Sequence, residues 1–270
     1  MLPREHGAYG QLLFPLLTAL AISQPSTAAL LIAAAAVALF VGHEAVLVLL
    51  GRRGAAARRG RAHEAVVWLT ACGAIALLSG ALALVFLPPV DWWTLAAPIA
   101  VGIAAAVMIA WGRERTTAGE IVVSAALASV SFPVAIAGSA SVTVALTCAL
   151  AYTAVFTAAT VSVRAVIAAA CPERAGVPHA SRRACPERAR VPDASRATAF
   201  GGALVVLGAI VMLARQQIIL PAGPIAALPM CSVALVLVAL LPPPRYLRRI
   251  GWTLVGATAL TGIILVAAIR

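Results

Sequence analysis

The chain has 270 residues, of which 63 % are hydrophobic, and its mean hydropathy is +1.02. Because ordinary soluble domains contain only about 45–50 % apolar residues, this composition excludes a water-soluble globular protein. The formal net charge of +11 comes entirely from arginine, since the sequence contains no lysine, and so basic a chain raises the question of nucleic-acid binding. The positions of the arginines, described below, argue against nucleic acid as a partner.

Apolar segments long enough to cross a bilayer, which takes about 17–25 residues, recur along the whole chain. The sequence therefore predicts an all-α fold, a polytopic membrane helical bundle that forms a single integral membrane domain over residues 1–270. We expect about nine transmembrane helices, over residues 8–23, 27–50, 65–87, 95–111, 119–138, 142–168, 198–214, 222–241 and 250–269.

A polar stretch, PREHGAYGQLLFP at residues 3–15, stands at the start of the first predicted helix. Glu5 complements the positive start of a helix, and Tyr9 lies one turn further along the same face. His6 lies on a neighbouring face. Two interpretations remain open for these side chains: they anchor the helix among the lipid headgroups, or they belong to a ligand- or proton-handling site.

The core of that stretch, HGAY at residues 6–9, follows a basic-acidic pair and precedes apolar residues and Pro15. It resembles the opening signature of the YwiC-like family of bacterial membrane proteins. Two later stretches fit the family more loosely, GRERTTAGEIVVS at 112–124 and VFTAATVSVRAVI at 155–167. The resemblance implies a multi-pass protein of the bacterial inner (plasma) membrane, and it implies no particular activity, cofactor or enzyme class.

The arginines fall almost entirely on one side of the predicted spans, and only Arg215 and Arg270 fall on the other. By the positive-inside rule, this asymmetry predicts a cytoplasmic N-terminus and an outside C-terminus. The positive charge is then a determinant of topology that can also bind anionic lipid headgroups on the cytoplasmic side. The two larger predicted loops, residues 51–64 and 169–197, are both cytoplasmic.

The second of these loops contains a 14-residue tandem repeat. ACPERAGVPHASRR at 170–183 is followed directly by ACPERARVPDASRA at 184–197. Solenoid repeats use longer units and at least three copies, so we interpret this pair as a tolerated loop insertion. A role in binding acidic lipid or a protein partner is the alternative.

A few ionisable residues fall within the predicted spans, where a charge costs at least about 2.5–3.5 kcal/mol. His43 and Glu44 lie roughly 10 Å from the cytoplasmic end of the second helix, because each helical residue rises 1.5 Å. We expect Glu44 to be protonated, paired with a cation or exposed to a water-filled cavity. Arg164, near the end of the sixth helix, is its natural counter-charge. A capping box formed by Thr117 and Glu120 explains the acid in the fifth helix.

All of these groups lie near the cytoplasmic half of the membrane on the first, second, fifth and sixth helices. If those helices are neighbours, the polar side chains line one inward-facing cavity. The cysteines form no CxxC pair, and we expect no metal site. The candidate substrate-binding residues are Glu5, His6, Tyr9, His43, Glu44, Glu120 and Arg164.

Nine helices with the main cytoplasmic loops after helices two and six are similar to the UbiA-type intramembrane prenyltransferases. That resemblance implies aspartate-rich motifs that hold magnesium and a prenyl diphosphate. The corresponding stretches here, HEAVLVLLGRRGAAARRG and SVRAVIAAACPER, contain no aspartate. Prenyl transfer through a two-magnesium site is therefore not expected, even if the arrangement of helices is shared.

Three functions follow from these observations. The leading hypothesis is a protein whose cytoplasm-facing polar cavity binds a lipid or quinone-like amphiphile. The second is a small-molecule or proton-coupled transporter, in which Glu44 and His43 exchange protons with the substrate. The third is a non-catalytic membrane scaffold or respiratory assembly factor.

Overall fold

The computed structural model describes residues 6–114, 116–170, 193–243 and 246–270, and in this part of the chain every regular element is a helix. The elements are α1 His6–Ile22, α2 Thr27–Leu49, α3 Ala55–Phe86, the short 3₁₀ helix η1 Pro89–Leu95, α4 Ala96–Ala110, α5 Thr117–Ser129, α6 Ser131–Ala137, α7 Val142–Ala170, α8 Asp193–Arg215, α9 Ala222–Leu240 and α10 Leu247–Ile269.

Seven of the described segments are long and apolar enough to cross a membrane: α2, α3, η1 with α4, α5 with α6, α7, α9 and α10. The chain is therefore a multi-pass membrane protein by length and composition. The first and seventh predicted spans fall on two shorter apolar helices, Ala8–Ile22 within α1 and Phe200–Arg215 within α8. Polar residues precede Phe200 in α8 and shorten its apolar part.

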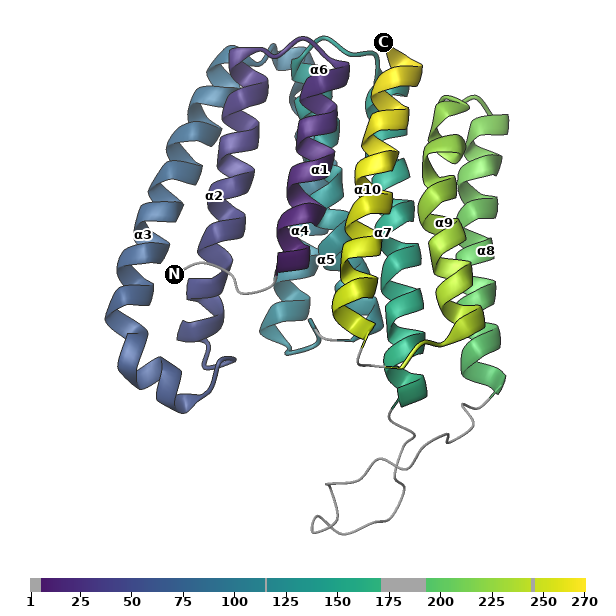
Figure 1. Ribbon diagram of the computed structural model, residues 1–270. Helices are drawn as coiled ribbons and strands as arrows, with labels where there is room; N and C mark the ends of the chain where they lie inside the picture. The colour runs from purple at the N-terminus through teal and green to yellow at the C-terminus, as the bar shows by residue number, and fades with distance from the viewer. Residues whose placement is uncertain (1–5, 115, 171–192, 244–245) are drawn as a thin grey trace.

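The helices run alternately up and down, so that successive connections lie at opposite ends of the bundle (Figure 1). In the figure, α2, α4, α7 and α9 end at the lower end of the bundle, and α1, α3, α6 and α8 end at the upper end, where the C-terminus also lies. The lower end carries Arg52 and Arg113 in its turns and Arg248 in the first turn of α10, and we call it the basic end. The predicted one-sided distribution of arginine thus has a physical counterpart in the bundle.

Three predicted boundaries were wrong. α3 begins at Ala55, so that most of the predicted loop 51–64 is helical, because alanine and arginine are strong helix formers. The predicted helix 119–138 is interrupted at Val130, since Pro133 has no N–H to donate to the carbonyl of Ser129 and its ring crowds that oxygen. Helix α7 continues to Ala170 and α8 begins at Asp193, so both helices extend into the predicted loop 169–197. The rest of its tandem repeat lies outside the described residues.

The core surrounds α7, which packs against α1, α5, α8, α9 and α10. Much of this core is alanine, and small side chains let membrane helices approach closely. At its centre the hydroxyls of Thr18 on α1 and Tyr152 on α7 share a buried hydrogen bond of 2.6 Å. Gly262 of α10 lies directly against this pair, because a Cβ there would be 2.8 Å from the Tyr152 oxygen.

Replacing this glycine tests the packing. We expect Gly262→Ala to lower the free energy of unfolding by about 1–3 kcal/mol, because the added methyl group must displace two buried hydroxyls that are bonded to each other. Gly256→Ala is the matched control on the same helix, since a Cβ at Gly256 meets no heavy atom within 4 Å. Unfolding of the purified proteins in detergent would be measured for both variants. Equal stability of the two variants would contradict the close approach of α10 to Thr18 and Tyr152.

Candidate functional site

Glu44, the acid buried in α2, is neutralised by an arginine from the following turn. Arg53 donates to both carboxylate oxygens, from Nε at 2.9 Å and from Nη2 at 2.6 Å. The chain can turn back this sharply because α2 ends at Leu49 and is followed by Gly51, whose φ of 74° belongs to the left-handed region that favours glycine. Of the three predicted states of Glu44, the structure shows pairing with a cation.

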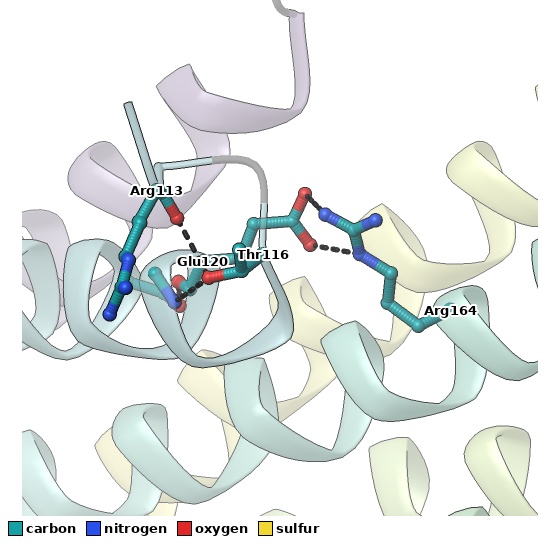
Figure 2. A network of polar contacts seen from close by, with 6 residues as sticks. Arg113, Thr116, Glu120 and Arg164 are labelled. Carbon is teal, nitrogen blue, oxygen red and sulfur yellow. Dashed lines mark hydrogen bonds and ion pairs between the residues drawn. The ribbon is translucent and has the colours of Figure 1, made fainter. Parts of the chain in front are cut away.

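A second ion pair joins two spans. Arg164 of α7 donates from Nε to Glu120 Oε2 of α5 at 2.9 Å, and its Nη2 pairs with Oε1 (Figure 2). The prediction that Arg164 is the counter-charge of Glu44 was therefore wrong: Arg53 takes that role and Arg164 pairs with Glu120. Glu44 and its arginine are only nine residues apart, whereas Glu120 and Arg164 are separated by 44.

The start of α5 places Glu120 for this contact. Thr116 is the N-cap: its hydroxyl accepts from the amide of Gly119 at 3.1 Å and donates to the carbonyl of Arg113 at 2.7 Å (Figure 2). The predicted capping box of Thr117 and Glu120 was wrong, because Thr116 is the N-cap and Gly119, not Glu120, lies three residues after it. In the structure the Glu120 carboxylate faces α7, and the cap relies on Thr116.

The two ion pairs differ in how accessible they are. The side chains of Arg53 and Glu44 are 24 % and 11 % exposed, whereas those of Arg164 and Glu120 are 31 % and 41 % exposed. Glu120 lies one turn from the start of α5, and Arg164 lies six residues before the end of α7. The second pair is thus the one that a molecule at the basic end can reach.

The remaining predicted site residues divide between described and undescribed parts of the chain. Tyr9 of α1 is half-buried and contacts Phe40 of α2 edge-on, with the ring centroids 5.3 Å apart. His43 is half-buried on α2. Glu5 and the side chain of His6 lie outside the described residues. Helix α1 packs against α2, which carries Glu44, and against α5 and α7, which carry Glu120 and Arg164.

The sequence prediction missed the roles of Arg52 and Arg53. Arg52 reaches from the α2–α3 turn to α4, where its Nη2 donates to the carbonyl of Ala110 at 2.6 Å. A cation at this position also interacts favourably with the negative end of the α4 dipole. The sequence contains a signal for such a contact: an apolar run followed by Gly-Arg is typical of a helix C-terminus with a basic side chain beside its last carbonyls.

Within residues 6–114, 116–170, 193–243 and 246–270, no group of three or more His, Cys, Asp or Glu side chains is close enough together to hold a metal ion.

The model of the YwiC-like protein family matches residues 2–136, which is half of the chain. The chain belongs to the YwiC-like family. No curated protein and no solved structure matches it. The YwiC-like region contains α1 to α5 and most of α6, and with them both members of the Glu44–Arg53 pair and the contact of Arg52 with α4. Arg164 lies beyond it.

The Glu44–Arg53 pair makes a prediction about stability. We expect Arg53→Gln to destabilise the protein by at least about 1–3 kcal/mol, because it leaves a buried carboxylate without its partner. The double variant Glu44→Gln/Arg53→Gln should recover part of this loss, since it removes the unpaired charge. Detergent unfolding of both proteins would be compared with that of Arg59→Gln, an exposed arginine at the same end of the bundle. A double variant less stable than Arg53→Gln would contradict the pairing.

Proposed function

We propose that this YwiC-like protein binds a lipid or quinone-like amphiphile, with the polar head against Arg164 and Glu120 at the basic end. The observation that carries the proposal is the part-exposed ion pair that joins two spans, α5 and α7. Charged groups within membrane spans are costly, and they are retained most often where they serve a ligand or an ion. A guanidinium and a carboxylate side by side offer donors and acceptors to a phosphate, carbonyl or hydroxyl head.

The other predicted site residues would extend the site from the basic end toward the middle of the bundle. Tyr9, in the first turn of α1, contacts Phe40, which lies nine residues before the end of α2, and α1 also packs against the two helices that carry the ion pair. Glu5 and His6 precede Tyr9 in the sequence, and His43 and Glu44 lie on α2. The amphiphile would have its head among these groups and its hydrocarbon tail among the apolar spans.

The proposal includes a cytoplasmic basic end, an N-terminus on that side, a location in the bacterial inner membrane and a UbiA-like arrangement of helices. Support for the orientation comes from the turns after α2 and α4, which carry four arginines between them, whereas the connection after α8 follows Arg215 alone. Support for the arrangement comes from the recurrence of arginine-rich connections after α2 and α7.

A transporter is the second candidate, and the interruption between α5 and α6 favours it. Transporters commonly bind substrates where a spanning helix is discontinuous. The interruption at Val130 lies within the Thr117–Ala137 span, ten residues beyond Glu120, and the following residues from Ser131 to Ile136 are buried. Proton-coupled movement of α6 relative to α5 would then connect Glu120 with the opposite face.

Native mass spectrometry of gently extracted protein tests the amphiphile site. We expect wild type to retain a small amphiphile and Arg164→Gln to lose it, with affinity reduced about tenfold or more, because a hydrogen bond to a charged group contributes about 1.5–3 kcal/mol. Arg249→Gln is the control, since it removes an exposed arginine at the same end of the bundle.

Absence of any amphiphile from all three proteins, with each of them folded, would overturn the binding proposal and favour the scaffold. Proton or solute flux in vesicles containing wild type, abolished by Arg164→Gln, would instead select the transporter.

A further inference from the structure

Two turns at the basic end are built alike and lie side by side. The turn after α2 continues through Gly51 and Arg52, and the turn after α4 continues through Gly112 and Arg113. Both glycines have a positive φ, 74° and 70°. The Arg52 guanidinium crosses from the first turn to the second, where it lies against Gly112 and donates to the last carbonyl of α4. The basic side chains of the two turns therefore share one surface.

That surface carries more positive charge than its acids neutralise. Arg58 and Arg59, in the first turns of α3, are exposed, and the structure records no acidic partner for them among the described residues. The Arg58 side chain passes over Gly51, within 3.8 Å of where a Cβ would be. Arg113, also exposed, lies over the ring of Trp111, with 5.9 Å between the guanidinium carbon and the ring centroid.

Two of the nearby acids are paired with arginines outside this set: Glu44 with Arg53, and Glu64 with Arg61 at 3.1 Å. Glu114, next to Arg113, has one carboxylate oxygen, Oε2, that is buried and has no hydrogen-bond partner among the described residues. We call the remaining surface the arginine patch, and it consists of Arg52, Arg58, Arg59 and Arg113 with Trp111.

We propose that the arginine patch binds the phosphate headgroup of an anionic membrane phospholipid. The patch lies where the α2 and α4 spans end, which is the level of the headgroups. Trp111 is 67 % exposed there, and tryptophan is enriched at the membrane interface. Arginine matches phosphate with a planar fork of donors. The patch is distinct from Arg164 and Glu120, so this inference goes beyond the amphiphile site.

The test compares two double variants that remove the same charge from the same end of the bundle. Arg58→Gln/Arg59→Gln alters the patch, whereas Arg248→Gln/Arg249→Gln alters exposed arginines at the start of α10. Binding of phosphatidylglycerol to the purified proteins would be titrated by native mass spectrometry, with phosphatidylcholine as the uncharged comparison. We expect the patch variant to bind phosphatidylglycerol about 25-fold more weakly than wild type, about fivefold for each arginine. The α10 variant should stay within about threefold of wild type, because its arginines lie outside the patch and solvent and salt screen their attraction to a lipid that is bound there.

Equal losses in the two variants would overturn the proposal, because the attraction would then be a property of the overall charge. Equal affinity of wild type for phosphatidylglycerol and phosphatidylcholine would overturn it as well. Inorganic phosphate that displaces the lipid at similar concentration would show a site for free anions instead of a lipid site. Circular dichroism and thermal unfolding in phosphatidylcholine would establish that each variant is folded. Arg58→Lys/Arg59→Lys, which keeps the charge but loses the planar fork, should bind phosphatidylglycerol more tightly than the glutamine variant and more weakly than wild type.

Discussion

The absence of water from the hydrocarbon core is the constraint on which the rest of this structure depends. A carboxylate that enters such a bundle needs a cation within reach, since the desolvation of an unpaired charge is prohibitive. Glu44 and Glu120 both satisfy this requirement with an arginine that contacts both carboxylate oxygens. Glu44 and Arg53 lie within one hairpin, whereas Glu120 and Arg164 lie on two spans that are far apart in the sequence.

The Glu44–Arg53 pair and the neighbouring Arg52 determine how the α2–α3 turn is held at the basic end. Arg53 turns back onto α2 and Arg52 extends outward to α4, so that one short turn both neutralises an acid and connects the α2–α3 hairpin to the next pair of helices. This connection matters because α3 packs against α2, while its opposite faces carry exposed apolar side chains such as Leu77 and Val85. Arginine contacts therefore add to the packing of α2 against α6 in holding the hairpin to the bundle.

The sequence predicted what depends on composition and failed where three-dimensional neighbours decide. Hydropathy located the spans, because a long apolar run in a membrane protein has few alternatives to a helix. It could not show that Arg164 faces Glu120, since hydropathy does not say which helices are adjacent. Thr116 and Thr117 are equivalent as caps in sequence, and only the turn after α4 selects the first. The nine-span topology with a UbiA-like arrangement stays a prediction, as do the roles of the site residues.

The separation of each acid from its arginine along the chain has a consequence for synthesis. At about 5–20 residues per second, the ribosome adds Arg53 about 0.5–2 s after Glu44 but Arg164 about 2–9 s after Glu120. The partner of Glu44 thus joins the chain before α3 is made. The partner of Glu120 joins it only after α6 and most of α7 have been made. The contact between α5 and α7 is therefore completed later in synthesis than the contact within the α2–α3 hairpin.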